Sequence, residues 1–194
     1  MNKHEQLDQL NTSMSMCSNC ALRCGASRVV PGDGNPEAQI MFIGEAPGKK
    51  EDEQGIPFVG AAGKFLNEML ASINLKREDI YIANVVKCRP PENRDPLPEE
   101  VAACWPWLEK QIEIIDPKII ITLGRHSLGR FYPGAKISEV HGKVFQKTFP
   151  DMGKRTFFAL YHPAAALYNG SMRQTLLDDF QKIPQILKQL KKEQ

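Results

Sequence analysis

The sequence IMFIGEAPGKKEDEQGIPFVGAAG, residues 40–63, decides the fold expected for this chain. Its first four residues are apolar, which predicts a buried strand. The small residues of the following turn, residues 44–48, would let a bound molecule approach the backbone closely. We expect a charged loop over residues 49–54, and then a glycine-bounded loop, residues 55–60, that presents Phe58. The stretch therefore predicts a strand that leads into a ligand-facing turn.

A helix with one apolar face is predicted from Ala62 onward. That face carries Phe65, Leu66, Met69, Leu70 and Ile73. A strand, a turn and a helix in this order place a pocket at the carboxyl end of the strand, where open α/β sheets bind ligands. A phosphate-binding loop is excluded because three residues, not four, separate Gly44 from Gly48. An ordinary crossing with Phe58 in the core is the alternative interpretation.

The composition is that of an ordinary globular protein, with 42% hydrophobic and 25% charged residues. We expect residues 1–194 to form a single domain with a cysteine-containing N-terminal segment. The net charge of +2 neither demands nor excludes a nucleic acid partner. No apolar run reaches the length of a membrane span, and the N-terminus lacks a signal-peptide core. We therefore expect a cytoplasmic protein without a membrane partner.

Alternating apolar strands and amphipathic helices predict the fold class. The strands are expected at residues 40–43, 80–86, 119–123 and 156–161. The other helices are expected at residues 4–12, at 98–115, from Gly124 and from Ser171, with an interruption at Pro184. Residues 133–156 are polar and predict only two or three weak strands. The order indicates a three-layer α/β/α fold around a central four-stranded, mostly parallel sheet.

Four of the five cysteines fall into two pairs, Cys17 with Cys20 and Cys88 with Cys104. In a reducing compartment such residues are more often metal ligands or buried thiols than disulfides. The first pair has the C-x2-C spacing of a chelator, whereas the long second spacing is unusual for zinc. An iron–sulfur cluster fits the four residues equally well, and unrelated buried thiols are the alternative. Cys24 is interpreted as a bystander.

Polar groups follow three of the four predicted strands. Glu45 comes directly after the first strand, Asn84 lies near the end of the second, and His162 follows the fourth. Because parallel strands end at one edge of a sheet, these groups are expected to converge with Phe58. An amide and an aromatic ring suit a flat heterocycle, because the ring stacks on its face and the amide reads its edge. An Asn84 bonded to local backbone is the alternative, and the other histidines (His4, His126 and His141) are interpreted as structural.

Four motifs in this order make the chain similar to the family 4 uracil-DNA glycosylases, the iron–sulfur class of bacteria and archaea. They are GEAPG at residues 44–48, PFVGAAG at 57–63, NVVKCRPP at 84–91 and HPAAAL at 162–167. The paired cysteines accompany them, and the resemblance spans residues 17–190. Four motifs in sequence are far more specific than any one of them.

The resemblance implies a DNA repair glycosylase that flips deoxyuridine out of DNA and hydrolyses its N-glycosidic bond. Such a monofunctional enzyme releases uracil and leaves an abasic site. A [4Fe-4S] cluster with a structural role is implied on Cys17, Cys20, Cys88 and Cys104, with zinc as the alternative. The implied uracil pocket consists of Gly44, Glu45, Ala46, Phe58, Asn84 and His162.

The resemblance also implies roles within the pocket. Phe58 would stack on uracil, while Asn84 would accept from N3–H and donate to O4, a pattern that cytosine reverses. His162 would stabilise the leaving uracil anion through a hydrogen bond on its O2 side. Ala46 stands where family 1 uracil-DNA glycosylases have a water-positioning aspartate. We therefore hypothesise that a nearby carboxylate, Glu45 or Glu51, orients the water.

DNA contacts follow from the same resemblance. Leu167 would enter the gap left by the flipped base, although packing against the last helix is the alternative. Tyr168 follows it, where the resemblance leads us to expect a basic residue. Candidate contacts to the DNA backbone are Lys87, Arg89, Arg94 and Lys143. The partner is uracil-containing DNA, single- or double-stranded, and replication or repair proteins are further candidate partners of a monomer.

Two other functions are compatible with these residues. One is a non-catalytic iron–sulfur or zinc module that binds DNA, attached to a polymerase, which would bind DNA without releasing a base. The other is a glycosylase for another damaged base, such as hypoxanthine. Asn84 favours uracil, whereas Ala46 leaves the range of damaged bases open.

Overall fold

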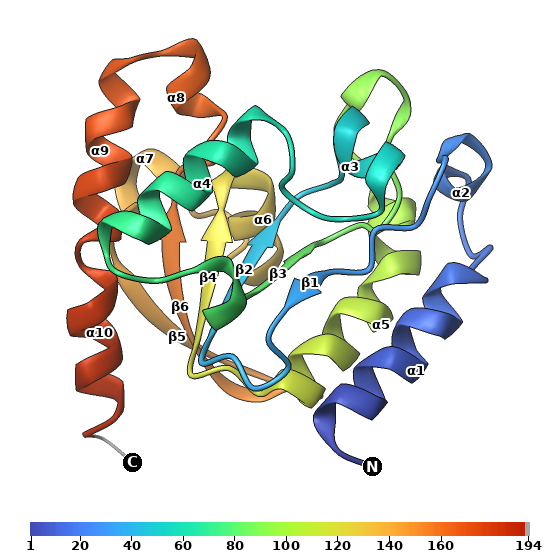
Figure 1. Cartoon of the computed structure of the whole chain (residues 1–194), viewed down its shortest axis with the longest axis horizontal. Helices are drawn as coiled ribbons and strands as arrows, with labels where there is room; N and C mark the ends of the chain where they lie inside the picture. Colours follow the sequence, from blue (N-terminus) through green and yellow to red (C-terminus); the bar gives the residue numbers. More distant parts are fainter. Residues whose placement is uncertain (193–194) are drawn as a thin grey trace.

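The computed structural model describes residues 1–192, in which one six-stranded sheet lies between two layers of helices (Figure 1). The strands are β1 (Asp33–Gly34), β2 (Ile40–Gly44), β3 (Tyr81–Asn84), β4 (Ile119–Leu123), β5 (Val144–Phe149) and β6 (Gly153–Leu160). Their order is β1-β3-β2-β4-β6-β5. The four central strands, β3, β2, β4 and β6, are parallel to one another and correspond to the four predicted apolar segments.

The six-stranded sheet corrects the expectation of four strands, because an antiparallel strand is added at each edge. β1 is two residues long and lies in a turn-rich segment. The side chains of β5 alternate between exposed and half-buried positions, so it lacks the continuous apolar run of a buried strand. Both edge strands form by pairing with backbone groups that the neighbouring strand would otherwise leave unpaired.

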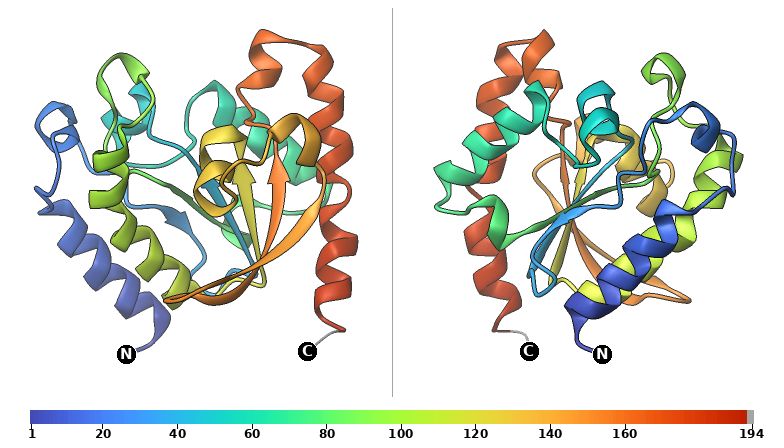
Figure 2. Two further views of the ribbon diagram at one scale, coloured as in Figure 1. Left: turned by 180° about the vertical axis from the view of Figure 1, so that it is seen from behind. Right: turned by 45° about the vertical axis from the view of Figure 1, so that its right-hand side comes forward.

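Helices cover both faces of the sheet, which confirms the three-layer fold class. They are α1 (Lys3–Ser15), α2 (Leu22–Gly25), α3 (Lys49–Gln54), α4 (Ala61–Ser72), α5 (Pro98–Ile115), α6 (Gly124–Phe131), α7 (Ile137–Val140), α8 (Ala165–Tyr168), α9 (Ser171–Phe180) and α10 (Ile183–Leu190), with 3-10 turns η1 (Arg77–Asp79) and η2 (Pro91–Asn93). α1 and α5 lie side by side over one face, whereas α4, α9 and α10 cover the other (Figures 1 and 2). Within residues 1–192, no helix combines the length and the apolarity needed to cross a membrane.

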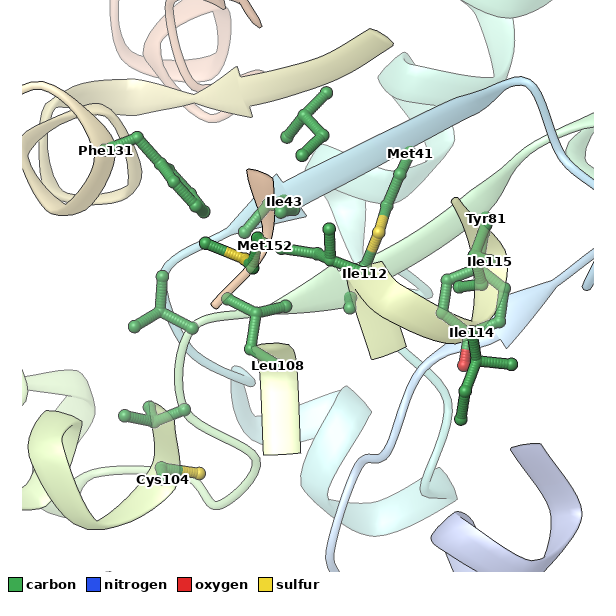
Figure 3. Close-up of a cluster of buried hydrophobic side chains, with 14 of the residues drawn as sticks. Met41, Ile43, Tyr81, Cys104, Leu108, Ile112, Ile114, Ile115, Phe131 and Met152 are labelled. Atoms are coloured by element: carbon green, nitrogen blue, oxygen red, sulfur yellow. The ribbon is translucent and has the colours of Figure 1, made fainter. Parts of the chain in front are cut away.

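The side chains of β2 alternate between two hydrophobic cores, one on each face of the sheet, as the period of a strand requires. Ile43 belongs to the core that includes Leu108 of α5 (Figure 3). Phe42 faces the opposite core and stacks on Phe180 of α9 with ring centroids 5.8 Å apart. Burial on both faces explains why β2 is apolar at successive positions.

Two local expectations have different outcomes. Residues 49–54, expected as a loop, form the helix α3, which ends at Gly55 with a left-handed φ of 75°. The sequence of α3 has no apolar period. The helix is held in place by the buried Asp52, whose Oδ1 accepts a hydrogen bond from the Ser27 backbone N–H at 2.9 Å. The interruption at Pro184 is confirmed, because α9 ends at Phe180 and α10 has this proline in its first turn.

Candidate active site and metal centre

The predicted pocket lies at the carboxyl edge of the parallel strands. A cavity of about 360 Å³ opens there, a size typical of ligand sites. β2 and β3 pair with Gly44 beside Asn84, so the GEAPG turn and the amide come together. The predicted residues that line the cavity are Glu45, Ala46, Glu51, Phe58, Asn84 and His162. The packing of the strands therefore gathers groups that the sequence separates widely.

An uncommon backbone conformation holds Phe58 at the pocket. Its φ of 53° lies in the left-handed region, which is unusual for an aromatic residue. A Cβ atom at Gly63 would lie 1.8 Å from the Phe58 carbonyl oxygen, so only glycine permits this approach. Arg77 Nη1 donates to the same carbonyl at 2.9 Å. The sequence analysis missed Arg77, because no local motif marks a residue that acts on a loop nineteen positions away.

Asn84 presents an unsatisfied acceptor in this pocket. The residue is 2% exposed, and its Oδ1 has no hydrogen-bond partner within residues 1–192. Leaving a buried acceptor unpaired costs about 1–3 kcal/mol. A Cβ atom at Gly44 would meet both this oxygen, at 2.4 Å, and the Phe58 ring, at 2.8 Å. The acceptor and the aromatic ring therefore converge where a planar ligand with an N–H donor would satisfy Asn84.

His162 is placed as a neutral hydrogen-bond donor. Its Nδ1 accepts from the Ala164 backbone N–H at 3.1 Å, so the proton of the neutral ring lies on Nε2. Burial lowers the pKa of His162 to about 4, and the negative charge of Glu51 opposes this shift. Its ring centroid lies 5.5 Å from that of Phe58. At neutral pH the Nε2–H group is therefore available beside the aromatic ring.

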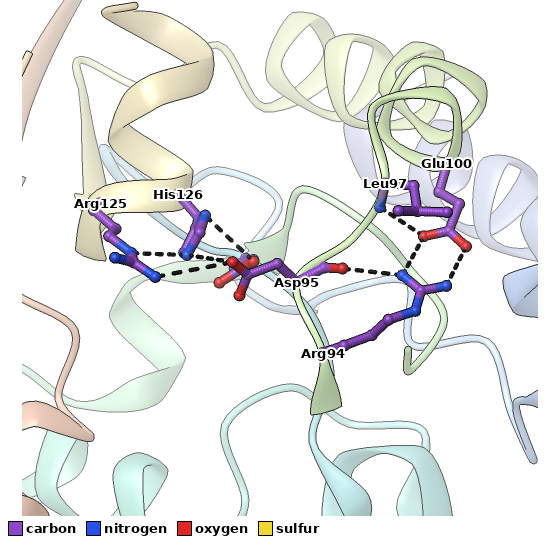
Figure 4. A network of polar contacts seen from close by, with 7 residues as sticks. Arg94, Asp95, Leu97, Glu100, Arg125 and His126 are labelled. Carbon is purple, nitrogen blue, oxygen red and sulfur yellow. Dashed lines mark hydrogen bonds and ion pairs between the residues drawn. The ribbon is translucent and has the colours of Figure 1, made fainter. Parts of the chain in front are cut away.

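Glu45 lies in a network of charged groups at the rim. Burial raises the pKa of Glu45 to about 7, helped by the charge of Asp95 and opposed by Arg125 and Arg130. Its Oε1 has no hydrogen-bond partner within the described chain, and His126 Nδ1 lies 3.7 Å away. His126 Nε2 lies 3.3 Å from Asp95 Oδ2 and accepts from Arg125 Nε at 2.9 Å (Figure 4). Burial therefore favours the protonated form of Glu45, and the neighbouring charges adjust its pKa.

The sequence analysis treated His126 as structural and missed its place beside Glu45. A signal was available, because His126 follows the buried strand β4 just as His162 follows β6. The position is fixed by the next residue, since the Ser127 hydroxyl donates to the Ile43 carbonyl at 2.7 Å. This bond ties the first turn of α6 to β2 at the pocket edge.

The two candidate carboxylates have different surroundings. Glu51 Oε1 accepts hydrogen bonds from the backbone N–H groups of Val59, at 2.9 Å, and Gly60, at 2.8 Å. These bonds connect α3 to the loop that carries Phe58 and place a negative charge at the start of α4. Glu51 is therefore engaged in holding the pocket together, whereas Glu45 Oε1 has no such partner.

The four paired cysteines line one cavity. Cys17 and Cys20 lie between α1 and α2, Cys88 follows β3, and Cys104 lies on the buried face of α5. Cys24 is exposed and does not line this cavity. The fold thus brings together the four residues that the resemblance implies as ligands, from three separate parts of the chain.

The donor set fits a bound metal centre larger than one zinc ion. Zinc, with Zn–S bonds of about 2.3 Å, would hold its four sulfurs about 3.8 Å apart. Among the described residues, no three cysteine sulfurs lie within 4.8 Å of one another. Burial and the neighbouring thiols raise the pKa of Cys88 to about 12, and burial raises that of Cys104. A bound cation would therefore favour the thiolate forms of Cys88 and Cys104 that metal binding requires.

Exposed apolar side chains lie at the same edge of the molecule. Leu167 is 49% exposed and Tyr168 is 90% exposed at the end of α8. α8 immediately follows the turn that contains His162 and lies on the pocket side of the sheet (Figure 1). Leu167 is thus only partly packed and presents an apolar surface close to the pocket.

The four basic residues considered for DNA contacts divide into different groups. Lys87 is buried, so the expectation that it contacts DNA phosphates is wrong. Arg94 forms a bidentate pair with Glu100, with Nη2–Oε1 at 2.7 Å (Figure 4). Arg89 is half-buried and Lys143 is exposed. The error arises because lysine is usually solvated, whereas the turn after β3 points this one into the protein.

Comparisons with known proteins agree with this geometry. A family model described as the Uracil DNA glycosylase superfamily matches residues 31–190. The chain is 47% identical over 188 residues to the Type-4 uracil-DNA glycosylase of Archaeoglobus fulgidus, covering 94% of each protein. It is 41% identical to that of Thermotoga maritima, covering 96% of this chain and 97% of the relative. A DNA polymerase of Bacillus phage SP01 is 31% identical over 80% of this chain but 16% of the polymerase.

Proposed function

The chain belongs to the uracil DNA glycosylase superfamily, and on that premise we propose that it excises uracil from DNA and leaves an abasic site. The observation that carries the proposal is the buried, unpartnered Asn84 Oδ1 beside the ring of Phe58. Uracil presents an N3–H donor next to its O4 acceptor, and Asn84 can pair with both. Cytosine would leave the amide unpaired, which explains discrimination between two bases of nearly equal size.

The reaction requires the nucleotide to leave the base stack of the DNA, because the base must enter the pocket to reach these residues. With uracil stacked on Phe58, the bond between C1′ and N1 breaks, and the electron pair stays on the uracil ring. The Nε2–H group of His162 donates to O2 of the leaving anion and stabilises it. Water adds to C1′ and passes a proton to the ionised carboxylate that orients it, and we assign this role to Glu45 rather than Glu51. This choice is supported by the free Oε1 of Glu45 and the occupied Oε1 of Glu51.

The proposed role of Glu45 predicts an acidic limb in the pH profile. Because the pKa of Glu45 is raised to about 7, the ionised form is lost as pH falls through this value. The single-turnover rate should then fall about tenfold per pH unit well below the pKa. Asp95→Asn should move the limb to lower pH by removing a negative charge, and Arg125→Gln should move it to higher pH.

Glu45→Gln provides the control for that experiment and should abolish the limb along with most of the rate. His162 does not contribute to the limb near neutrality, because its pKa is about 4. An unchanged rate and pH profile in Glu45→Gln would show that Glu45 does not orient the water. Catalysis would then be attributed to stabilisation of the leaving uracil anion alone.

We propose a [4Fe-4S] cluster on Cys17, Cys20, Cys88 and Cys104, with Cys24 outside it. The cluster would tie the N-terminal segment to the loop after β3 and to α5, and the hydrolysis itself needs no electron. The proposal is supported by the shared cavity and by sulfur spacings wider than one zinc ion requires. Loss of the bound metal should therefore weaken folding before it affects any chemical step.

The proposal extends to the surroundings of the site. Leu167 is assigned to the gap that the flipped base leaves in the DNA, because it is exposed beside the turn that carries His162. Arg89 and Lys143 are assigned to DNA backbone contacts. We further propose that the protein acts as a cytoplasmic monomer and a single domain, on single- or double-stranded DNA, with replication or repair proteins as partners.

The first test uses an end-labelled single-stranded oligonucleotide with one deoxyuridine, followed by alkali to reveal abasic sites. Cleavage at that position is expected from the purified protein and should be lost in Asn84→Ala. A matched oligonucleotide with cytosine at the same position should stay intact. DNA binding without cleavage, from protein that retains its metal, would reject the proposal. That outcome would favour a binding module, the function suggested by the similarity to part of a phage DNA polymerase.

A further inference from the structure

Lys87 lies buried between the pocket and the cysteine cavity. The residue is 2% exposed, and its Nζ donates to the Asn84 carbonyl at 2.8 Å and to Gln111 Oε1 at 2.6 Å. Its backbone N–H donates to Cys104 Sγ at 3.2 Å, and the residue lines the cavity of the four cysteines. One residue therefore contacts both sites: its side chain bonds to the residue assigned to read the base, and its backbone bonds to the wall of the proposed metal centre.

The hydrogen bonds of this ammonium go to neutral oxygens, which leaves its charge without a partner. A buried charge is strongly unfavourable unless an opposite charge lies close to it. Within the described chain, the hydrogen bonds of Nζ go to the Asn84 carbonyl and to Gln111 Oε1, and neither oxygen carries a charge. Four thiolates around a [4Fe-4S] core or a zinc ion leave a centre with a net negative charge. That centre would supply the missing counter-charge.

We propose that Lys87 is the internal counter-charge of the four-cysteine centre and a positioning residue for Asn84. The inference rests on the proposed metal centre, whichever metal it holds, and on the assignment of Asn84 to uracil. Through the bond from Nζ to the Asn84 carbonyl, the ammonium fixes the end of β3, where the amide enters the pocket. Metal bound at one site thereby stabilises the geometry of the other.

The proposal predicts that Lys87→Met lowers stability more in the metal-loaded protein than in the metal-free protein. In the metal-loaded protein the variant should be less stable than the wild type, because an attractive pair is lost. In the metal-free protein the variant should lose less stability, because the wild type then buries a charge with no partner. Lys87→Met leaves the neutral oxygens of Asn84 and Gln111 unpaired in both forms. The free-energy cost of these unpaired oxygens therefore cancels when the effect of the substitution is compared between the metal-loaded and the metal-free protein.

The experiment measures urea unfolding of the wild type and Lys87→Met, each metal-loaded and after removal of metal by a chelator. Metal removal should lower the folding equilibrium constant at least tenfold more in the wild type than in Lys87→Met. Arg23→Met is the matched control, because Arg23 also lines the cavity but is partly exposed to solvent. The charge of Arg23 acts on Cys88, but water screens it, so the response of this variant to metal removal should differ from that of the wild type far less than the response of Lys87→Met does. Equal losses in the wild type and Lys87→Met would overturn the proposal.

A second measurement applies if the metal-free chains do not stay folded. Metal should pass from Lys87→Met to a chelator at least tenfold faster than from Arg23→Met, and equal rates would overturn the counter-charge. The positioning role is read from KM against kcat, since Lys87→Met should raise KM for the deoxyuridine oligonucleotide more than it lowers kcat. An unchanged KM would reject it.

Metal analysis of the wild type separates this inference from the proposals beneath it. A wild type that carries no metal would overturn the counter-charge, because no anion would then balance Lys87. Uracil release is measured independently in the same preparation. A result that rejects the proposed glycosylase activity can therefore be told apart from one that rejects the proposed role of Lys87.

Discussion

His162→Ala is expected to slow uracil release about 100- to 1,000-fold in single-turnover assays, as the loss of one donor to a developing anion does elsewhere. Deletion removes the Nε2–H group that the structure presents beside Phe58. Because the pKa of His162 is about 4, the wild-type ring is neutral throughout the physiological range. The stabilisation is therefore that of a fixed neutral donor and should not change with pH near neutrality.

The control for this prediction is His162→Gln, whose side-chain N–H can reach the position of Nε2. It should recover part of the lost rate, while the affinity for uracil-containing DNA stays close to that of the wild type in both variants. A glutamine variant as slow as alanine, with DNA affinity lost in parallel, would indicate that His162 shapes the pocket rather than stabilising the leaving group.

Gly44→Ala is expected to reduce uracil release by about 100-fold or more, because small misplacements of a reacting group carry penalties of this size. The added Cβ would lie 2.4 Å from Asn84 Oδ1 and 2.8 Å from the Phe58 ring, so both groups must move apart. The backbone itself is unstrained there, because Gly44 does not have a positive φ. The loss should therefore appear in uracil binding and release, with a modest effect on folding.

Gly129→Ala is the matched control, because a Cβ at this position of α6 meets no atom within 4 Å. This variant should keep the wild-type rate, and alanine in a helix should slightly favour folding. Both variants are compared by single-turnover release of uracil and by urea unfolding. Full activity in Gly44→Ala would show that uracil does not lie between Asn84 and Phe58.

The centre of the fold could be predicted because strands buried on both faces are continuous apolar runs. The predicted strand at residues 119–123 and the predicted helix at 98–115 have the bounds of β4 and α5. The weak strands predicted within residues 133–156 include the region of β5 without its bounds, and helix α3 is not predicted because its residues are polar and carry no apolar period. Their structure depends on backbone pairing and on contacts such as that of Asp52, which come from other parts of the chain.

The candidate site divides in a similar way. The chain order of Glu45, Asn84 and His162 after three strands is enough to predict one pocket edge, because parallel strands end together. The sequence does not reveal that Glu45 lies beside His126 and Asp95, since that contact joins two loops and the helix α6 through space.

The sequence by itself determined the parallel centre of the sheet, the motif loops and the paired cysteines, because these depend on residue type, order and period. Only the tertiary structure decided which charges are buried and what they face. From the sequence, Lys87 is interpreted as an exposed cation that could contact DNA. In the structure it is buried between Asn84 and the cysteine cavity. Desolvation and Coulomb interactions depend on distances in space, and separation along the chain does not give those distances.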